Sequence, residues 1–271
     1  MNALVTPQDA LHGGDPAQAL KLLQDQVRAK PADAKLRVFL FQLLCVTGQW
    51  ERALNQLDVA AGLDASALAM AQTYREAIKC ELLRAEVFKG KKVPMIFGQP
   101  EPWLALLIEA LLREGQGDLA AAQKLRDQAF EQAPASAGTL DGATFEWLAD
   151  ADMRLGPVLE AVINGKYYWV PFARLTRIDI EAPEDLRDTV WMPAHFVFEN
   201  GGESVGLIPT RYPGSESADG LLALSRKTEW QESAQGVFTG LGQRLFTTDA
   251  GDKPLMDVRQ ITLEAAPADA P

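Results

Sequence analysis

The sequence has few of the residues from which catalytic and metal centres are usually built. Its 271 residues include only two cysteines, Cys45 and Cys80, and two histidines, His12 and His195. The cysteines lack the spacing of a zinc ligand set, and both lie in helical apolar patterns, where a free cysteine behaves as a small hydrophobic residue. We therefore expect reduced core thiols and no metal site. A disulfide between neighbouring helices is the alternative, because it depends on a Cα separation that the sequence does not give.

The sequence also lacks a long apolar run, a basic leader and an excess of positive charge. No uninterrupted apolar run approaches the roughly 18 residues of a membrane-spanning helix, and residues 1–12 have no basic segment followed by an apolar core. Up to Gly156 there are 16 Lys and Arg against 20 Asp and Glu, and beyond it 10 against 17. Repulsion from phosphates argues against a nucleic-acid or anionic-membrane surface. We expect a soluble cytoplasmic protein without nucleic-acid or membrane partners.

Internal repeats mark the first part of the chain as helical. Residues 14–20 (GDPAQAL) are followed 34 positions later by residues 48–54 (GQWERAL), and a third copy begins at Gly117 (GDLAAA). Thirty-four residues is the tetratricopeptide period. In each copy Gly closes one helix, Asp or Gln begins the next, and small Ala lets paired helices approach closely. Because a connection over 89–102 interrupts the array, we expect a tetratricopeptide-like bundle of about seven helices over 1–156.

Helix pairs of this kind usually present a face on which an extended or helical peptide lies. We interpret the array as a surface that binds another protein, with a purely structural bundle as the alternative. Trp103, which follows Pro102 at a helix start, fits either interpretation.

The pattern changes at Gly156-Pro157. Phe145, Trp147, Leu148 and Ala151 carry the last helical spacing, and Gly followed by Pro ends the helix. The Asn164-Gly165 pair between apolar segments 158–163 and 166–172 predicts a hairpin, because both residues tolerate positive φ in a type I′ turn. A helix over 158–163 is the weaker alternative. We expect segment 147–172 to brace the two parts of the chain against each other.

Further strand signals follow this hairpin. Alternation over 178–181 predicts a half-buried strand, and 195–198 and 205–208 predict two strands joined through Asn200-Gly201-Gly202. Segments 243–247 and 258–263 indicate two more strands, and 221–224 is ambiguous. This spacing predicts a small barrel or a strongly bent antiparallel sheet. The expected fold class is α+β, with a β-rich domain over 157–264 and a disordered tail over 265–271.

Ordered motifs in the second part resemble the ImpE family, also called TagJ, an accessory family of bacterial type VI secretion. The resemblance covers more than 100 residues, and the helical part shares the family's tetratricopeptide-like character. The motifs are DADMRLGP (150–157), GKYYWVPF (165–172), APEDLRD with VW (182–188 and 190–191), IPTRYPGS (208–215), RKTEW (226–230), GQR (242–244) and DVR (257–259).

The resemblance implies a cytoplasmic, non-enzymatic protein that binds the N-terminal helix of the small, TssB-type subunit of the contractile sheath. It also implies an indirect link to a ClpV-type ATPase, in sheath assembly or recycling. The implied mode is helix-in-groove recognition, in which apolar anchors enter a groove and polar rim residues set the orientation. Two other hypotheses are a generic tetratricopeptide scaffold and an enzyme with a site around His195, Arg211 and Glu229.

No catalytic or cofactor site emerges from the residues themselves. Asp150 and Asp152 look like paired acids, but two positions apart on a helix they would point about 200° from each other, so we expect solvated or Arg-paired carboxylates. The chain has no Gly-rich phosphate loop and no Cys/His cluster, and His195 lacks a nucleophile in a recognisable turn. We expect no cofactor.

Tryptophan and arginine recur in the motifs, and they support two interpretations. They could brace a small sheet through a buried network of arginines and carboxylates, which we favour, or they could contact a partner. We expect the partner to bind at the face between the two domains, within reach of loop 89–102. The candidate partner-binding residues are Trp103, Trp169, Arg187, Trp191, Arg211, Tyr212, Trp230 and Arg244.

Overall fold

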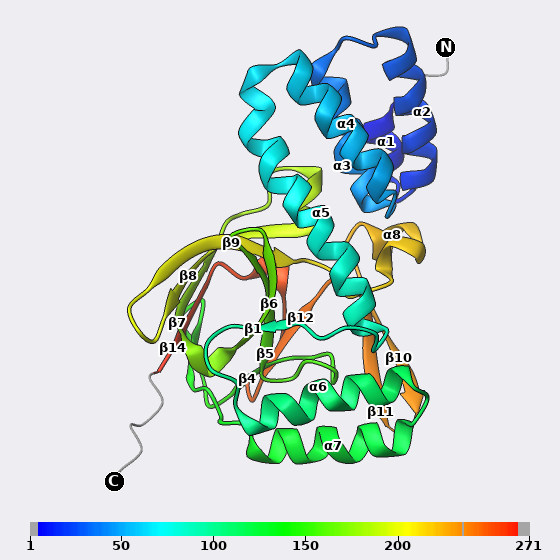
Figure 1. Ribbon diagram of the computed structural model, residues 1–271. Coiled ribbons are helices and arrows are strands. Elements are labelled where there is room, and N and C mark those ends of the chain that lie inside the picture. The colour runs from blue at the N-terminus through cyan, green and yellow to red at the C-terminus, as the bar shows by residue number, and fades with distance from the viewer. Residues whose placement is uncertain (1–4, 235, 265–271) are drawn as a thin grey trace.

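A computed structural model describes residues 5–234 and 236–264, so the tail expected over 265–271 lies outside the described residues. A helical part is followed by a strand-rich part, as the sequence predicts (Figure 1). None of the helices in the described ranges is long and apolar enough to cross a membrane. The helical part consists of α1 (Pro7–His12), α2 (Pro16–Ala29), α3 (Ala34–Val46), α4 (Trp50–Leu63), α5 (Leu68–Phe88), α6 (Pro102–Gly115) and α7 (Leu119–Gln132).

The repeated glycines and acids form the helix boundaries for the expected physical reasons. Gly14, Gly48 and Gly117 have φ of 80°, 66° and 82°, a left-handed conformation that disfavours side chains. Asp15 caps α2 by accepting the Gln18 N–H at 2.8 Å, and Asp118 caps α7 in the same way. The repeat in the sequence is therefore a repeat of helix ends.

The helices do not form one continuous array. In Figure 1, α1 to α4 gather at one end of the molecule, α5 runs diagonally across the sheet, and α6 and α7 form an antiparallel pair at the other end. The connection between α5 and α6 carries β1 (Met95–Ile96), which pairs in parallel with a strand of the large sheet. The segment that interrupts the repeats thus docks on the sheet edge.

The strand-rich part contains a nine-stranded sheet in the order β1-β6-β5-β9-β8-β7-β14-β2-β3. All pairs are antiparallel apart from β1–β6. Because β1 and β3 end the order, this is an open sheet over the described residues, which favours the expected bent sheet over a closed barrel. Its other strands are β2 (Gly138–Leu140), β3 (Ala143–Phe145), β5 (Val158–Ile163), β6 (Lys166–Pro171), β7 (Leu175–Ile180), β8 (Trp191–Phe198), β9 (Glu203–Pro209) and β14 (Gln260–Leu263).

Two smaller sheets and several short helices complete the described strand-rich part. One sheet has the order β13-β12-β4, and the other is the hairpin β10–β11, which the sequence reasoning did not identify. The ambiguous segment around Leu222 is the short helix α8. The elements are β4 (Leu148–Asp150), β10 (Thr228–Ala234), β11 (Val237–Gly242), β12 (Leu245–Thr248), β13 (Gly251–Pro254), α8 (Gly220–Ala223) and the 3₁₀ helix η3 (Leu186–Thr189).

Both hairpins expected from turn residues are present. Asn164 and Gly165 have φ of 50° and 72°, which the type I′ turn requires, and Ile163 pairs with Lys166. Strands β8 and β9 flank Asn200-Gly201-Gly202 and pair antiparallel along their length. The alternative of a helix over 158–163 is wrong.

The helix predicted through Phe145 and Trp147 up to Gly156 is also wrong. Helix α7 ends at Gln132, and β2, β3 and β4 follow. Phe145 and Leu148 are buried, but they belong to two separate strands, so their three-residue spacing spans a turn and imitates a helical period. The change from helix to strand lies between Gln132 and Gly138.

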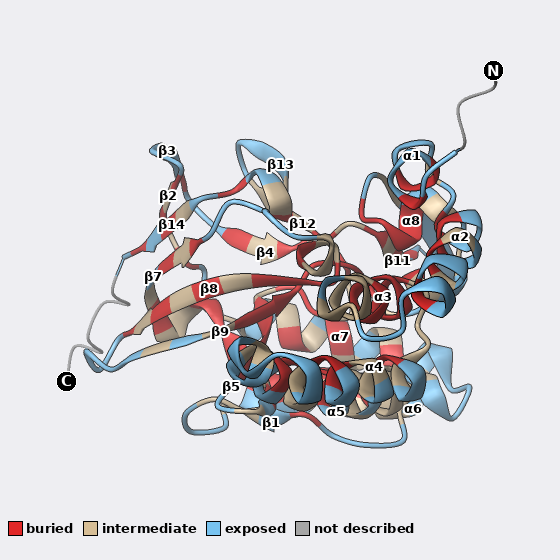
Figure 2. Ribbon diagram, turned by 90° about the horizontal axis from the view of Figure 1, so that it is seen from above, coloured by how far each residue is buried: buried red, intermediate tan, exposed pale blue. Residues whose placement is uncertain are grey.

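The helices and the sheet share one of the two hydrophobic cores. Phe41 and Tyr74 from the helices pack with Trp169 and Trp191 from the sheet, and the Tyr74 and Trp191 ring centroids are 5.7 Å apart. Figure 2 shows buried residues along the strands, whereas α2 and α5 each carry both exposed and buried residues. Cys45 and Cys80 are buried and unlinked, which confirms the expected core thiols.

Candidate functional site

The junction of the two parts centres on Glu160 of β5, which is fully buried. Arg84 of α5 donates to both of its carboxylate oxygens, from Nε at 2.6 Å and from Nη2 at 2.9 Å. Arg244 donates to Oε2, and the Tyr167 hydroxyl donates to Oε1 at 2.5 Å. Burial alone raises the pKa of Glu160, but the two arginines and these hydrogen bonds outweigh it and lower the pKa to about 2. Glu160 is therefore ionised at neutral pH.

Asp150, at the end of β4, extends the network to the small sheet. Its carboxylate pairs with Arg244 and accepts the Tyr212 hydroxyl at 3.0 Å, while Arg244 Nε donates to the Pro209 carbonyl at 2.9 Å. Burial raises the pKa of Asp150 to about 6, although the Arg244 charge opposes that shift.

Asp152 is held by a different arginine. Arg154 donates to it from Nε at 2.9 Å and from Nη2 at 2.5 Å, and the Gly240 N–H donates to Oδ2 at 2.9 Å. Asp150 and Asp152 are therefore both paired with arginines, which confirms the expectation of Arg-paired carboxylates. The other expectation, a solvated pair on a helix, is wrong because both are buried outside any helix.

Arg211 binds the end of α3. Its Nη1 donates to the Val46 carbonyl at 2.7 Å and to the Ala223 carbonyl at 2.5 Å, and its Nη2 donates to the Cys45 carbonyl at 2.9 Å. The Cys45 and Val46 carbonyls lie at the C-terminus of α3 and carry partial negative charge, and the Cys45 carbonyl also accepts the Gly48 N–H at 3.1 Å. Arg211 therefore joins the helical part to the segment after β9.

Six of the eight candidate partner-binding residues lie in the interior. Trp169 Nε1 donates to the Tyr167 hydroxyl at 2.8 Å, and Trp191 Nε1 donates to Glu81 of α5 at 3.0 Å. Burial and these hydrogen bonds fit the bracing interpretation for the members of the second part, and Trp103 is buried in the core that the helices share with the sheet. The buried set is Trp103, Trp169, Trp191, Arg211, Tyr212 and Arg244.

The other two candidates reach the surface at different places. Arg187 is partly buried, pairs with Asp185 at 2.5 Å and lies 5.0 Å from the centre of the Tyr74 ring. Trp230 of β10 is 39% exposed, and its ring centroid is 5.7 Å from that of Tyr212. The structure does not bring these two side chains together.

The residues proposed for an enzymatic site also lie apart. His195 Nε2 is 3.1 Å from Glu203 on the neighbouring strand, Arg211 is buried against α3, and Glu229 pairs with Lys227 at 2.7 Å. Within residues 5–234 and 236–264, no group of three His, Cys, Asp or Glu is arranged to hold a metal ion.

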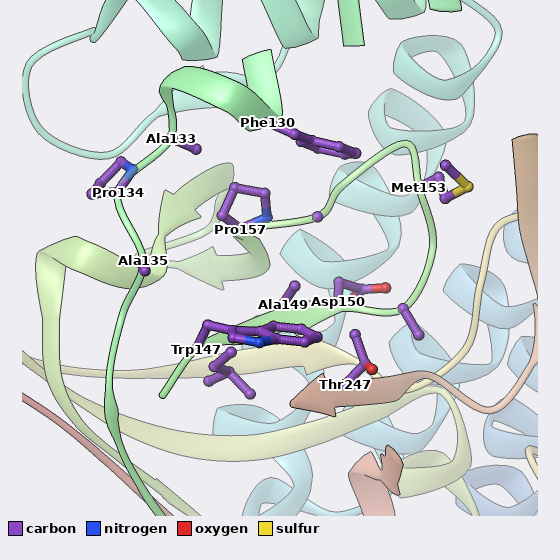
Figure 3. A pocket seen from close by; sticks show the side chains of 13 residues that line it. Phe130, Ala133, Pro134, Ala135, Trp147, Ala149, Asp150, Met153, Pro157 and Thr247 are labelled. Atoms are coloured by element: carbon purple, nitrogen blue, oxygen red, sulfur yellow. The ribbon is translucent and has the colours of Figure 1, made fainter. Parts of the chain in front are cut away.

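An open apolar groove of about 380 Å³, which we call the seam groove, lies where the end of α7 meets β4. Figure 3 shows Phe130 and Pro157 on one side, Trp147 and Ala149 on the other, and Met153 at one end. Trp147 is 39% exposed. The remaining lining residues are Ala133, Pro134, Ala135, Leu148, Asp150, Ala151, Gly156 and Thr247.

Gly156 allows the Phe130 wall of this groove to form. Its φ is 54°, and a Cβ there would lie 2.4 Å from Cε1 of Phe130. The motif around Gly156 therefore lets α7 pack closely on the loop after β4. This groove was not predicted from the sequence, because Trp147 was expected on a helix, whereas it directly precedes β4. The local signal is Trp147 beside the acid Glu146, a few residues before the motif that begins at Asp150.

Comparisons with known proteins agree with this architecture. Residues 142–262 match the family model described as ImpE protein, and residues 10–76 match a tetratricopeptide repeat model. A Pseudomonas aeruginosa protein named type VI secretion system accessory component TagJ is 53% identical over 264 residues, which cover 97% of this chain and 92% of that protein. A crystal structure of a Vibrio parahaemolyticus protein, 28% identical, has a TM-score of 0.88 and covers 96% of this chain and 98% of that one. The chain belongs to the ImpE (TagJ) family.

Proposed function

We propose that this chain is a non-enzymatic, cytoplasmic accessory component of a type VI secretion system. We propose further that it binds the N-terminal helix of the small contractile-sheath subunit and so assists sheath assembly or recycling, with at most an indirect link to the ClpV-type ATPase. The observation that carries the proposal is the open apolar groove at the braced seam. The accessory role is supported by the 53% identical relative of that name.

The groove has the properties that helix-in-groove recognition requires. Its lining is mainly apolar, and it includes an exposed tryptophan, a residue type that often dominates binding energy. Its walls come from α7, β4 and the loop before Pro157, which the buried network around Asp150 holds in place. A preformed groove binds with a smaller loss of conformational entropy.

The same groove is poorly equipped for catalysis. Among its lining residues the titratable side chain is Asp150, and Arg244 and Tyr212 already hold that carboxylate. Oδ1 of Asp150 accepts the Tyr212 hydroxyl and the Asp152 N–H, and its Oδ2 pairs with Arg244, so neither oxygen is free to contact a substrate or a metal ion. This supports a binding role for the groove.

Titration calorimetry of the full chain with a synthetic peptide tests the proposal, the peptide being the N-terminal helix of the small sheath subunit from the same secretion system. We expect one peptide per chain with micromolar affinity, and a negative heat-capacity change because apolar surface is buried. A scrambled peptide of the same composition is the control. No binding of the native peptide at high micromolar concentration would contradict the proposal.

A further inference from the structure

The β10–β11 hairpin extends the seam groove at Met153. The Met153 N–H donates to the Phe238 carbonyl at 3.3 Å, and the Phe238 N–H lies 3.3 Å from Met153 Sδ. Met153 lines the groove and Phe238 belongs to β11. The groove and the hairpin are therefore adjacent surfaces.

Two exposed aromatic side chains share one face of this hairpin. Trp230 pairs with Gly240, and Glu232 pairs with Phe238. Directly paired residues and residues two apart lie on the same face of a strand pair, so Trp230 and Phe238 are diagonal neighbours. They are 39% and 44% exposed. Together with the seam groove they form what we call the seam surface.

Four carboxylates are sequence neighbours or strand partners of residues in the seam surface. Glu131 follows Phe130, Glu146 precedes Trp147, Asp252 pairs across from Thr247, and Glu232 pairs across from Phe238. All four acids are exposed. The arginine next to Met153, Arg154, is bound to Asp152 and lies over the Phe88 ring, so it does not neutralise them. An apolar surface with acidic neighbours complements an amphipathic helix that carries basic residues beside its apolar stripe.

The tetratricopeptide-like helices are a weaker docking site, because the chain's own C-terminal part packs against them. Helix α3 packs against η3, and Gly14 lies against Leu221. Arg226 Nη1 donates to the carbonyls of Leu11 and His12 at 2.8 Å and 3.0 Å. The surface that a peptide would use on an isolated helical array is partly filled here.

We propose that the seam surface binds a single amphipathic helix whose apolar stripe contacts Trp147, Met153 and Phe238 and whose basic flanks face the carboxylates. This inference rests on the proposed function, and it specifies both the site and the charge of the partner helix.

Two truncations test the apolar part, with the full chain and the synthetic sheath peptide in calorimetry. Trp147→Ala and Phe238→Ala each lower the affinity by about 10-fold or more, because each removes an aromatic anchor. Val205→Ala is the matched control, since Val205 is 72% exposed on β9 away from the groove lining. We expect it to change the affinity less than about 2-fold. Unaltered circular dichroism shows that each variant folds.

A charge reversal tests the neighbouring carboxylates. The double variant Glu131→Lys with Glu232→Lys lowers the peptide affinity about 10-fold at low salt. It also makes the affinity less dependent on salt concentration than in the native chain. Glu181→Lys, an exposed acid elsewhere in the β-rich part, leaves both unchanged. If the native chain binds the peptide and all these variants bind equally well, the seam surface is contradicted while the proposed function stands. If the native chain does not bind the peptide, both are contradicted.

Discussion

Arg84 of α5 and Glu160 of β5 form a buried two-point ion pair between residues 76 positions apart, with contacts of 2.6 Å and 2.9 Å. The pair joins the helical part to the sheet, and Arg244 continues it to Asp150 beside the seam groove. The stability of the junction and the shape of the groove are therefore linked through a few charged side chains.

Replacing the central carboxylate should destabilise the fold strongly. Glu160→Gln removes the carboxylate that Arg84 and Arg244 share, so that Asp150 alone remains for Arg244 and the more distant Glu81 for Arg84. We expect a loss of about 3 to 5 kcal/mol in the free energy of unfolding. Urea denaturation measures this loss. Glu109→Gln, in an exposed pair with Arg113, is the control and should cost less than about 1 kcal/mol. Equal effects of the two variants would show that the buried pair does not brace the junction.

The same residue predicts a pH dependence. The folded pKa of Glu160 is about 2, below its ordinary value of 4.5, so its contribution to stability is full above pH 4.5 and is lost as the pH falls toward 2. The difference in unfolding free energy between the native chain and Glu160→Gln should therefore shrink between pH 5 and pH 3. A difference that stays constant over this range would contradict the assigned pKa.

The contribution of Asp150 to stability should change with pH in the opposite direction to that of Glu160. Burial raises its pKa to about 6 from 3.8, so its contribution is full below pH 3.8 and is lost as the pH rises through 6. Relative to Asp150→Asn, the native chain should lose stability between pH 5 and pH 7. Urea titrations of both proteins at these two pH values measure the change, and a gain in the native chain would contradict it.

Arg211 should stabilise the fold because its planar guanidinium group binds several carbonyls at once. Arg211→Lys keeps a positive charge but cannot reach the carbonyls of Cys45, Val46 and Ala223 together, and we expect a loss of about 2 kcal/mol and faster amide exchange at the end of α3. Arg37 donates to the Pro31 carbonyl at an exposed position, so Arg37→Lys is the control. Similar small losses of stability in both variants would contradict the role of Arg211 in bracing the two parts of the chain.

Gly156 links the family motif to the groove. Gly156→Ala places a Cβ against Phe130 at a positive φ, and we expect a loss of about 2 kcal/mol together with weaker peptide binding. Gly142→Ala has a similar backbone cost, with φ of 85°, but its Cβ would meet nothing within 4 Å. Thermal unfolding and calorimetry compare the two. If peptide affinity falls equally in both, the Phe130 contact does not shape the site.

Features that depend on short stretches of sequence could be predicted. The Asn164-Gly165 hairpin and the glycines that close the repeated helices follow from the local preference for positive φ, and the structure confirms them. Helix and strand content was therefore accessible over most of the chain. The prediction of a helix around Trp147 was wrong, because apolar residues on two short strands have the spacing of a helical period.

The site was harder to predict, because burial is a property of the whole fold. Trp169 and Arg244 have the composition of a binding surface, yet both are fully buried and hydrogen bonded. Trp230 was singled out by sequence and is exposed, whereas Phe238 lies on a strand that the sequence reasoning did not identify. Only the fold places Phe238 next to Met153.

Hydrogen exchange of the full chain, with and without the sheath peptide, tests the central claim most directly. The account predicts slower exchange in the loop between β4 and β5 and in the β10–β11 hairpin, with little change in α2 and α3. Slower exchange confined to α1 through α4, with the loop and the hairpin unchanged, would contradict it.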